Sequence, residues 1–157
     1  MRKFLLFNEK KALWHFRKWV NDENEHVRRL VSEGLRPLLP WGQKLPHFAK
    51  NPLITWDLLE ILKHDSSAYV RKSVANHIND HSKNHPDLVV QKLMEWKKSS
   101  FNNKEIDWII RHASRTLIKN GHGDVFKLHG VDREAIKFIS QKILTKTISI
   151  GSVLQVE

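Results

Sequence analysis

The stretch YVRKSVANHINDHSKNHPD (residues 69–87) decides the fold, because similar phrases stand before and after it. Upstream lies HVRRLVSEGLRP (residues 26–37), and downstream lies WIIRHASRTLIKNG (residues 108–121). Each phrase begins with an aromatic residue or a histidine, continues through apolar and basic residues, and runs on with helical spacing. We interpret the three phrases as copies of one structural unit.

The copies align without gaps when Val27, Val70 and Ile110 share a column, which gives spacings of 43 and 40 residues. The neighbouring columns also hold one chemical type each. They contain an acid five positions earlier (Asp22, Asp65, Glu105), an arginine one position later (Arg28, Arg71, Arg111), then a basic residue or histidine (Arg29, Lys72, His112), and an apolar residue eight positions later (Leu35, Ile78, Ile118). Agreement over so many columns indicates a repeat.

A period of about 40–47 residues is typical of HEAT and armadillo repeats, in which each unit is a pair of helices. The partner helices are predicted at residues 9–20, 55–64 and 86–96, where apolar residues recur at helical spacing. Residues 36–46 are too rich in Pro and Gly for a helix and are predicted to form a structured loop. The predicted fold class is therefore all-α, with HEAT-like helical repeats forming a short right-handed α-solenoid.

The end of the chain follows a different pattern. Residues 133–144 predict one more helix, and the β-branched tail KTISIGSVLQVE (residues 146–157) predicts a strand. The expected organisation is a solenoid over residues 1–145, with about three helix-pair repeats and a terminal helix, followed by a short β-like tail over residues 146–157.

The charge balance points to a polyanionic partner. Lys and Arg number 27 against 17 Asp and Glu, a net charge of +10. Nucleic acid is the first candidate, although an acidic protein or a membrane surface would also satisfy such an excess. The absence of cysteine excludes disulfides and thiolate metal sites. The apolar run near the N-terminus is too short for a signal peptide or a membrane span, so we predict a cytoplasmic protein without membrane contact.

Two sets of side chains have a structural interpretation. His77, His81 and His85 lie four residues apart and would share a helix face, a spacing known from zinc sites. Pro86 stops the helix at that point, however, and no carboxylate completes a ligand set, so we predict no metal site. The tryptophans mostly occupy apolar helical positions and are expected in the core, with Trp41 as the exception.

Three segments together resemble a known family: DENEHVRRLVSEGLRPLLPW, YVRKSVANHINDHSK and WIIRHASRTLIKNGH. They look like consecutive blocks of the AlkC-type branch of the HEAT-like alkylpurine DNA glycosylases, over residues 19–131. The resemblance implies excision of cationic N-methylated purines, such as 3-methyladenine, from double-stranded alkylated DNA, without a cofactor. It also implies that the tail is the opening strand of an immunoglobulin-like domain. No segment here resembles the family's upstream S-S-E-F-x-x-R-P block, so the chain is expected to match the central and later repeats, shortened at both ends, and the resemblance supports DNA binding more strongly than catalysis.

The resemblance also implies roles for individual residues. Glu33 and Trp41 would be catalytic, with Glu33 near the developing sugar cation and Trp41 facing the damaged nucleotide. Arg29 and Arg36 match the same motif, and Arg29 would grip a phosphate beside the lesion. The alternatives are a salt bridge from Glu33 to Arg29 or Arg36, and a loop anchor role for Trp41 in which the indole packs on the core.

The repeat columns add further candidates for DNA contact. Equivalent positions in a solenoid project from one surface, so basic residues there would form a stripe along a phosphate backbone. The predicted DNA-binding residues are Arg28, Arg29, Arg36, Arg71, Lys72, Arg111 and Arg115. Some of these arginines could instead pair with the preceding acids and tie the repeats together. The alternative function is a non-catalytic HEAT-repeat scaffold that binds an acidic protein or peptide.

Overall fold

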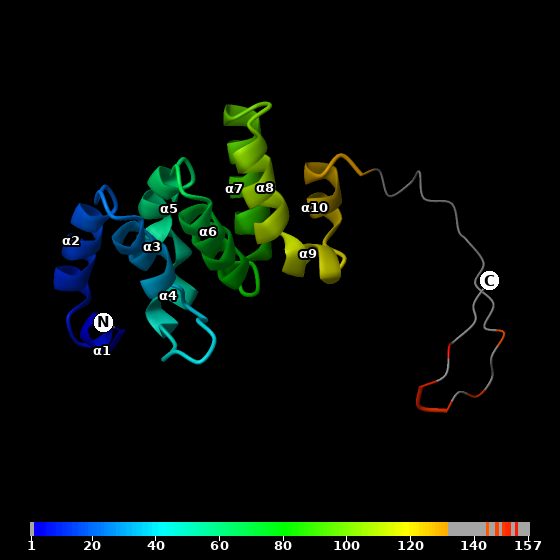
Figure 1. Ribbon diagram of the computed structural model, residues 1–157, viewed down its shortest axis with the longest axis horizontal. Helices are drawn as coiled ribbons and strands as arrows, with labels where there is room; N and C mark the ends of the chain where they lie inside the picture. Colours follow the sequence, from blue (N-terminus) through cyan, green and yellow to red (C-terminus); the bar gives the residue numbers. More distant parts are fainter. Residues whose placement is uncertain (1, 132–143, 145–146, 148, 152, 154–157) are drawn as a thin grey trace.

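Three helix pairs stacked in a row form the body of the protein (Figure 1). The computed structural model describes residues 2–131, 144, 147, 149–151 and 153. The first helices of the pairs are α2 (Glu9–Trp19), α5 (Trp56–Leu62) and α7 (Pro86–Ser99), and the second helices are α3 (Glu25–Gly34), α6 (Ala68–His81) and α8 (Lys104–Ala113). Helix α6 packs between α3 and α8, so the second helices form one continuous layer. The described residues contain no strand, and the predicted all-α HEAT-like fold is confirmed.

Short helices connect and flank the pairs. They are α1 (Arg2–Phe7), α4 (Pro46–Lys50), a 3₁₀ helix (Pro52–Thr55), α9 (Arg115–Lys119) and α10 (Gly123–Leu128). Of these, only α9 lies within a stretch that the repeat pattern predicted as helical throughout, residues 108–121. Helix α8 ends where the Ser114 hydroxyl donates to the carbonyl of Ile110, 2.5 Å away, a contact that competes with the helical backbone ladder. None of the described helices combines the length and the apolarity needed to cross a bilayer.

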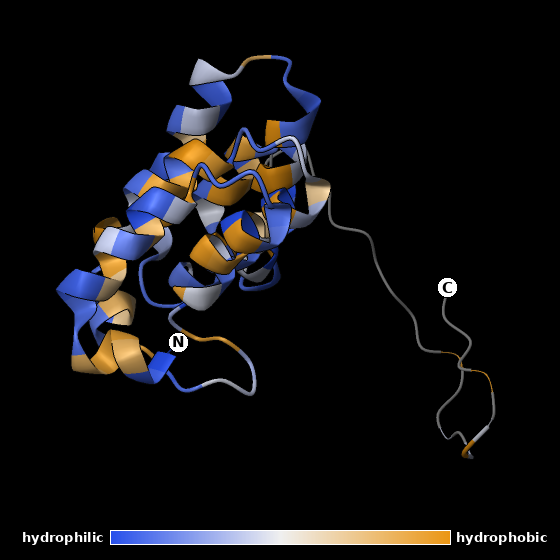
Figure 2. Cartoon of the chain, turned by 60° about the vertical axis from the view of Figure 1, so that its left-hand side comes forward, coloured by the Kyte–Doolittle hydropathy of each residue, from blue (hydrophilic) through white to orange (hydrophobic). Residues whose placement is uncertain are grey.

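The core lies where the helix pairs face one another, and Figure 2 shows apolar residues concentrated there. On α6, Val70, Val74 and Ile78 are completely buried, at the four-residue spacing of one helix face. Trp56 and Trp96 are buried and Trp19 packs against the core, whereas Trp14 and Trp108 are exposed, so the core prediction is wrong for those two. Trp41, the predicted exception, is exposed as well. An apolar position on a helix does not guarantee burial when it lies at the edge of the buried face.

The register of the third repeat differs from the sequence alignment. The second helices begin at Glu25, Ala68 and Lys104, which are 43 and 36 residues apart. Asp22 and Asp65 both lie ahead of their helices and accept a hydrogen bond from the backbone N–H two residues on, at 2.9 and 2.8 Å. Glu105 instead lies in the first turn of α8. The alignment was therefore one turn out in the third copy. A slip of four residues preserves a helix face, so apolar spacing alone does not reveal it.

The corrected register changes which residues are equivalent. Trp108, not His112, corresponds to Arg29 and Lys72, while His112 corresponds to Asn76. The predicted terminal helix and most of the predicted tail strand lie outside the described residues, and the boundary at residue 145 stays a prediction.

Candidate nucleic-acid interface

The exposed sides of α3, α6 and α8 form what we call the second-helix surface. Its two central rows run across the repeats at equivalent positions: Arg29, Lys72 and Trp108, then Glu33, Asn76 and His112. Contacts between the repeats hold the rows together. The His112 Nε2 lies 3.1 Å from Asn76 Oδ1, and a guanidinium nitrogen of Arg115 donates to the same oxygen at 3.1 Å.

Glu33 lies between two arginines on this surface. Its Oε1 accepts a hydrogen bond of 2.8 Å from Arg36, and its Oε2 accepts one of 2.8 Å from the hydroxyl of Ser73 on the next repeat. Arg29 approaches Oε2 at 3.5 Å, while its guanidinium lies 4.3 Å from the centre of the Tyr69 ring. The Glu33 side chain keeps 18% of its surface exposed. The predicted salt bridges to both arginines are present, and they orient a carboxylate that solvent still reaches.

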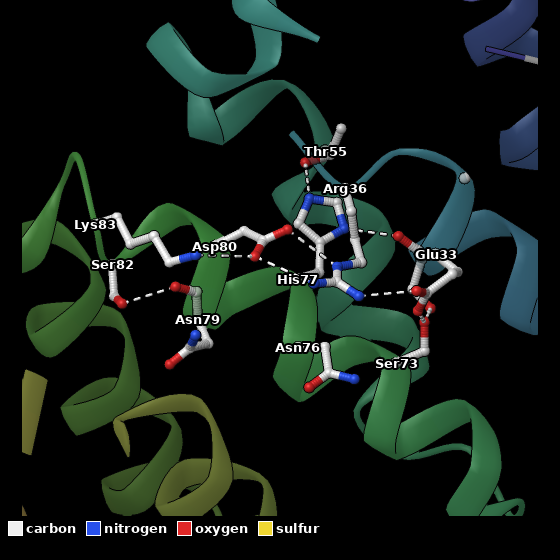
Figure 3. A network of polar contacts seen from close by, with 12 residues as sticks. Glu33, Arg36, Thr55, Ser73, Asn76, His77, Asn79, Asp80, Ser82 and Lys83 are labelled. Atoms are coloured by element: carbon white, nitrogen blue, oxygen red, sulfur yellow. Dashed lines mark hydrogen bonds and ion pairs between the residues drawn. The ribbon is translucent and has the colours of Figure 1, made fainter. Parts of the chain in front are cut away.

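Arg36 forms an internal ion pair with Asp80 and is not a surface cation (Figure 3). Only 7% of the residue is exposed, and its guanidinium makes two hydrogen bonds to Asp80, of 3.0 and 3.2 Å. Burial alone would lower the pKa of Arg36, but the hydrogen bonds and the charge of Asp80 raise it overall. The pair ties α3 to α6. Arg36 is therefore not among the proposed phosphate contacts, because it is buried and paired with Asp80 and Glu33.

Arg28 and Arg71 perform one structural task in successive repeats. Arg28 makes two hydrogen bonds to the Asp65 carboxylate, of 2.6 and 3.0 Å, and donates to the carbonyls of Asp22 and Glu23. Arg71 donates in the same way to the carbonyls of Asp65 and Ser66, at 2.6 and 2.9 Å. Burial would raise the pKa of Asp65, but its hydrogen bonds to Arg28 lower it overall. Both arginines close the loop before a second helix. Arg28 also ties two repeats together through Asp65, which is the pairing that the alternative predicted for some of these arginines.

Three of the predicted DNA-binding residues remain exposed cations. The side chains of Lys72 and Arg111 make no hydrogen bond or ion pair with the residues that the structure describes. Arg115 is exposed and bonds only to neutral groups, the oxygen of Asn76 and the carbonyl of His112. With Arg29, these side chains supply the available positive charge among the predicted positions.

Two aromatic residues on this surface were missed by the sequence reasoning. Tyr69 and Trp108 line an open pocket of about 430 Å³ between α6 and α8, together with Lys72 and Lys104. Trp108 stacks on His112, with ring centres 5.0 Å apart and an interplanar angle of 8°. Burial, followed by the charges of Arg115 and Lys72, lowers the pKa of His112. An alignment on the first residues of the second helices, rather than on the apolar pattern, would have made Trp108 equivalent to Arg29.

Trp41 stands apart from this group. It is 107% exposed, so it does not pack on the core as the loop anchor alternative required. Its backbone adopts φ +59°, a left-handed conformation that costs a residue with a side chain about 1–2 kcal/mol. No hydrogen bond or ring contact joins Trp41 to Glu33 among the described residues. An exposed indole held in a strained turn has no evident role in stability.

Two of the three spaced histidines bond to backbone carbonyls, and the third is buried without a described partner. His77 is completely buried, its Nδ1 lies 2.9 Å from the carbonyl of Ser32, and burial lowers its pKa to about 3. His85 Nε2 lies 2.8 Å from the carbonyl of Ala49. His81 is also buried, neither of its ring nitrogens has a partner among the described residues, and burial lowers its pKa to about 2.

Comparison with known proteins places the chain. No protein-family model matches it. An uncharacterized protein of Bacillus subtilis, YhaZ, is 41% identical over 156 residues, which are 99% of this chain and 43% of YhaZ. The alkylpurine DNA glycosylase AlkC of Pseudomonas fluorescens, solved bound to DNA containing an abasic site analog, is 45% identical with a TM-score of 0.76, over 82% of this chain and 35% of AlkC. The chain is thus similar, over most of its length, to part of the AlkC/AlkD-type alkylpurine DNA glycosylases.

A further solved structure supports this similarity. AlkD2 of Streptococcus mutans is 38% identical with a TM-score of 0.60, over 73% of this chain and 52% of AlkD2. The resemblance inferred from the three sequence blocks is thus confirmed. The chain spans about half or less of the length of YhaZ, AlkC and AlkD2.

Proposed function

We propose that the chain binds duplex DNA through its second-helix surface, and that this binding supports the excision of N-alkylated purines by hydrolysis of the N-glycosidic bond. The similarity to AlkC supports this proposal, since that protein was solved bound to DNA. The charge supports it as well. Lys72, Arg111 and Arg115 are exposed, Arg29 is partly exposed, and the chain carries a net charge of +10. Lysine and arginine neutralise phosphates and release condensed counterions, which favours binding at low salt.

The chemistry asks little of the protein. Methylation at a ring nitrogen gives the base a positive charge and makes it a good leaving group. When the bond between C1′ and the base nitrogen breaks, its electron pair neutralises the base and leaves an oxocarbenium-like sugar. Water then adds to C1′ and releases a proton to solvent. A carboxylate near the sugar stabilises the cation, and an aromatic face attracts it further, so the reaction needs no cofactor.

Glu33 is the residue that carries the proposal. Two donors, Arg36 and Ser73, hold its carboxylate in one orientation, and Arg29 beside it is placed to contact a phosphate. A carboxylate that is preoriented and still open to solvent can stabilise charge that develops nearby without rearrangement of the site. Trp41, exposed and free of internal contacts, is the second proposed contact, on the damaged nucleotide.

The test is release of methylated purine from alkylated duplex DNA by the chain and by Glu33→Gln. We expect Glu33→Gln to lower the rate by about 100-fold or more, because it removes the negative charge and keeps the shape. Glu95→Gln is the matched control, since Glu95 is an exposed carboxylate on α7 bonded to Lys92. Equal rates for Glu33→Gln and the unmodified chain would overturn the assigned role, and no release by the unmodified chain would leave DNA binding alone.

The scaffold alternative is tested by competition in an assay of duplex DNA binding. If a polyglutamate peptide displaces duplex DNA at equal or lower concentration per charge, the surface does not select DNA. If duplex DNA competes more strongly, as we expect, the exposed cations of the surface favour a nucleic-acid backbone over an acidic peptide.

A further inference from the structure

Arg2, on the short helix α1, grips the loop that carries Trp41. Its Nε donates to the carbonyl of Gln43 at 2.6 Å, and its two terminal nitrogens donate to the carbonyls of Gly34 and Arg36, at 2.9 and 2.8 Å. One guanidinium thus joins the two ends of the loop over residues 35–45, which leaves the end of α3 (Figure 1). No other described side chain hydrogen-bonds to the backbone at both ends of this loop.

This contact also completes helix α3. The last carbonyls of a helix have no partner within it, and they form the negative end of the helix dipole. A cation near the C-terminus is therefore favourable, because it bonds these carbonyls and interacts with the dipole. Helix α3 has no basic residue in its own last turn. Arg2, 32 residues before Gly34, donates to one of these carbonyls. The end of α3 and the beginning of the loop are therefore fixed by a side chain from another helix.

The loop needs such a restraint because of Trp41. The Gly42 N–H donates to the Leu39 carbonyl at 3.2 Å, and the Leu45 N–H donates to the Pro37 carbonyl at 3.1 Å. Trp41 lies at the tip of the loop with a left-handed backbone. A bulky residue keeps such a conformation only where the surrounding contacts determine it. The indole itself contributes no packing, since it is fully exposed. The restraint must come from the backbone, and the three Arg2 bonds supply it.

We propose that Arg2 is a positioning residue that holds Trp41 in its strained, solvent-facing conformation for contact with the damaged nucleotide. This inference rests on the proposed function for the role of Trp41, and on the structure alone for the restraint. Lysine cannot replace arginine here, because a single ammonium does not reach three carbonyls in the plane of a guanidinium fork. Arg2→Ala and Arg2→Lys should therefore behave alike, although Arg2→Lys keeps the charge.

Two measurements test the inference. In amide hydrogen exchange, both Arg2 variants should exchange the Gly42 and Leu45 amides at least about 10-fold faster, while the Val74 and Ala75 amides in α6 keep their protection. Lys3→Ala, an exposed neighbour on α1, is the control and should leave the loop amides unchanged. Unchanged exchange at Gly42 and Leu45 in Arg2→Ala would overturn the proposal, as would a uniform loss of protection including α6.

The second measurement is a double-mutant cycle on affinity for duplex DNA bearing an abasic site analogue. Arg2→Ala should weaken binding by the same factor as Trp41→Ala, and the double variant should bind no more weakly than either. A double variant whose losses multiply would show that Arg2 acts independently of Trp41 and would overturn the proposal. If the unmodified chain binds no duplex DNA, the proposed function fails, and hydrogen exchange alone then decides whether Arg2 restrains the loop.

Discussion

Replacing His81 with leucine tests the electrostatics of the repeat interior. The imidazole is 1% exposed, neither ring nitrogen has a described partner, and its pKa is lowered to about 2 by burial and by the neighbouring His77. A histidine in the unfolded chain titrates near 6.5. Because the folded pKa lies below the unfolded one, the folded state is fully stable above about pH 6.5 and loses stability as the pH falls.

The size of the effect follows from the proton count. The unfolded ring is half protonated at about pH 6.5 and almost fully protonated at pH 4.5, while the folded ring stays neutral. The cost therefore approaches about 1.4 kcal/mol per pH unit and reaches about 2.3 kcal/mol over the interval. Four carboxylates have a lowered pKa, namely Glu60, Asp65, Glu95 and Asp124, and they add to acid unfolding mainly below this interval, because the usual values are 4.5 for Glu and 3.8 for Asp. His81→Leu should therefore flatten the pH dependence by about that amount.

Urea unfolding at pH 7.0, 5.5 and 4.5 provides the assay. His81→Leu should match or exceed the stability of the unmodified chain at pH 7, since no described hydrogen bond is lost. His77→Leu provides the contrast. It should also flatten the slope, but should cost about 1–3 kcal/mol at pH 7, because the Ser32 carbonyl loses its imidazole partner. An unchanged slope in His81→Leu would refute the reasoning, since it would mean that the ring is not kept neutral by burial.

Further predictions concern the arginine pair, the loop and the exposed cations. Arg36→Met should lower the free energy of unfolding by about 3–5 kcal/mol in urea titrations, because Asp80 would remain buried without its partner; a loss below 1 kcal/mol would contradict the internal pairing. Trp41→Gly should raise stability by up to about 1 kcal/mol, because glycine adopts a positive φ freely, while weakening binding to damaged duplex DNA. Lys72→Ala should change stability by less than about 0.5 kcal/mol and weaken duplex binding in fluorescence anisotropy, whereas Lys98→Ala on α7 should change neither.

The repeat could be predicted because its information is local. Apolar residues such as Val70, Val74 and Ile78 mark one helix face, and the recurrence of that face at a fixed period identifies helix pairs. The register of the third copy could not be predicted in the same way, because Ile106 and Ile110 occupy the same face one turn apart. Only the start of the helix, at the Asn103 cap, separates the two alignments.

The candidate site shows a sharper limit. Arg28 and Arg29 are adjacent and chemically identical, yet one closes a loop and the other lies over Tyr69 on the surface. The difference depends on partners 37 and 40 residues away in the chain. The role of Arg2 was likewise beyond prediction, since three backbone carbonyls leave no signal in the side-chain pattern.

Salt dependence of duplex DNA binding tests the central claim most directly. If Arg29, Lys72, Arg111 and Arg115 each neutralise a phosphate, the logarithm of the association constant should fall with the logarithm of salt at a slope of about −3.6, about 150-fold between 50 and 200 mM. The variant Lys72→Ala/Arg111→Ala/Arg115→Ala should reduce that slope to about −0.9. Absence of binding at low salt, or an undiminished slope in the triple variant, would contradict the assignment of the second-helix surface to DNA.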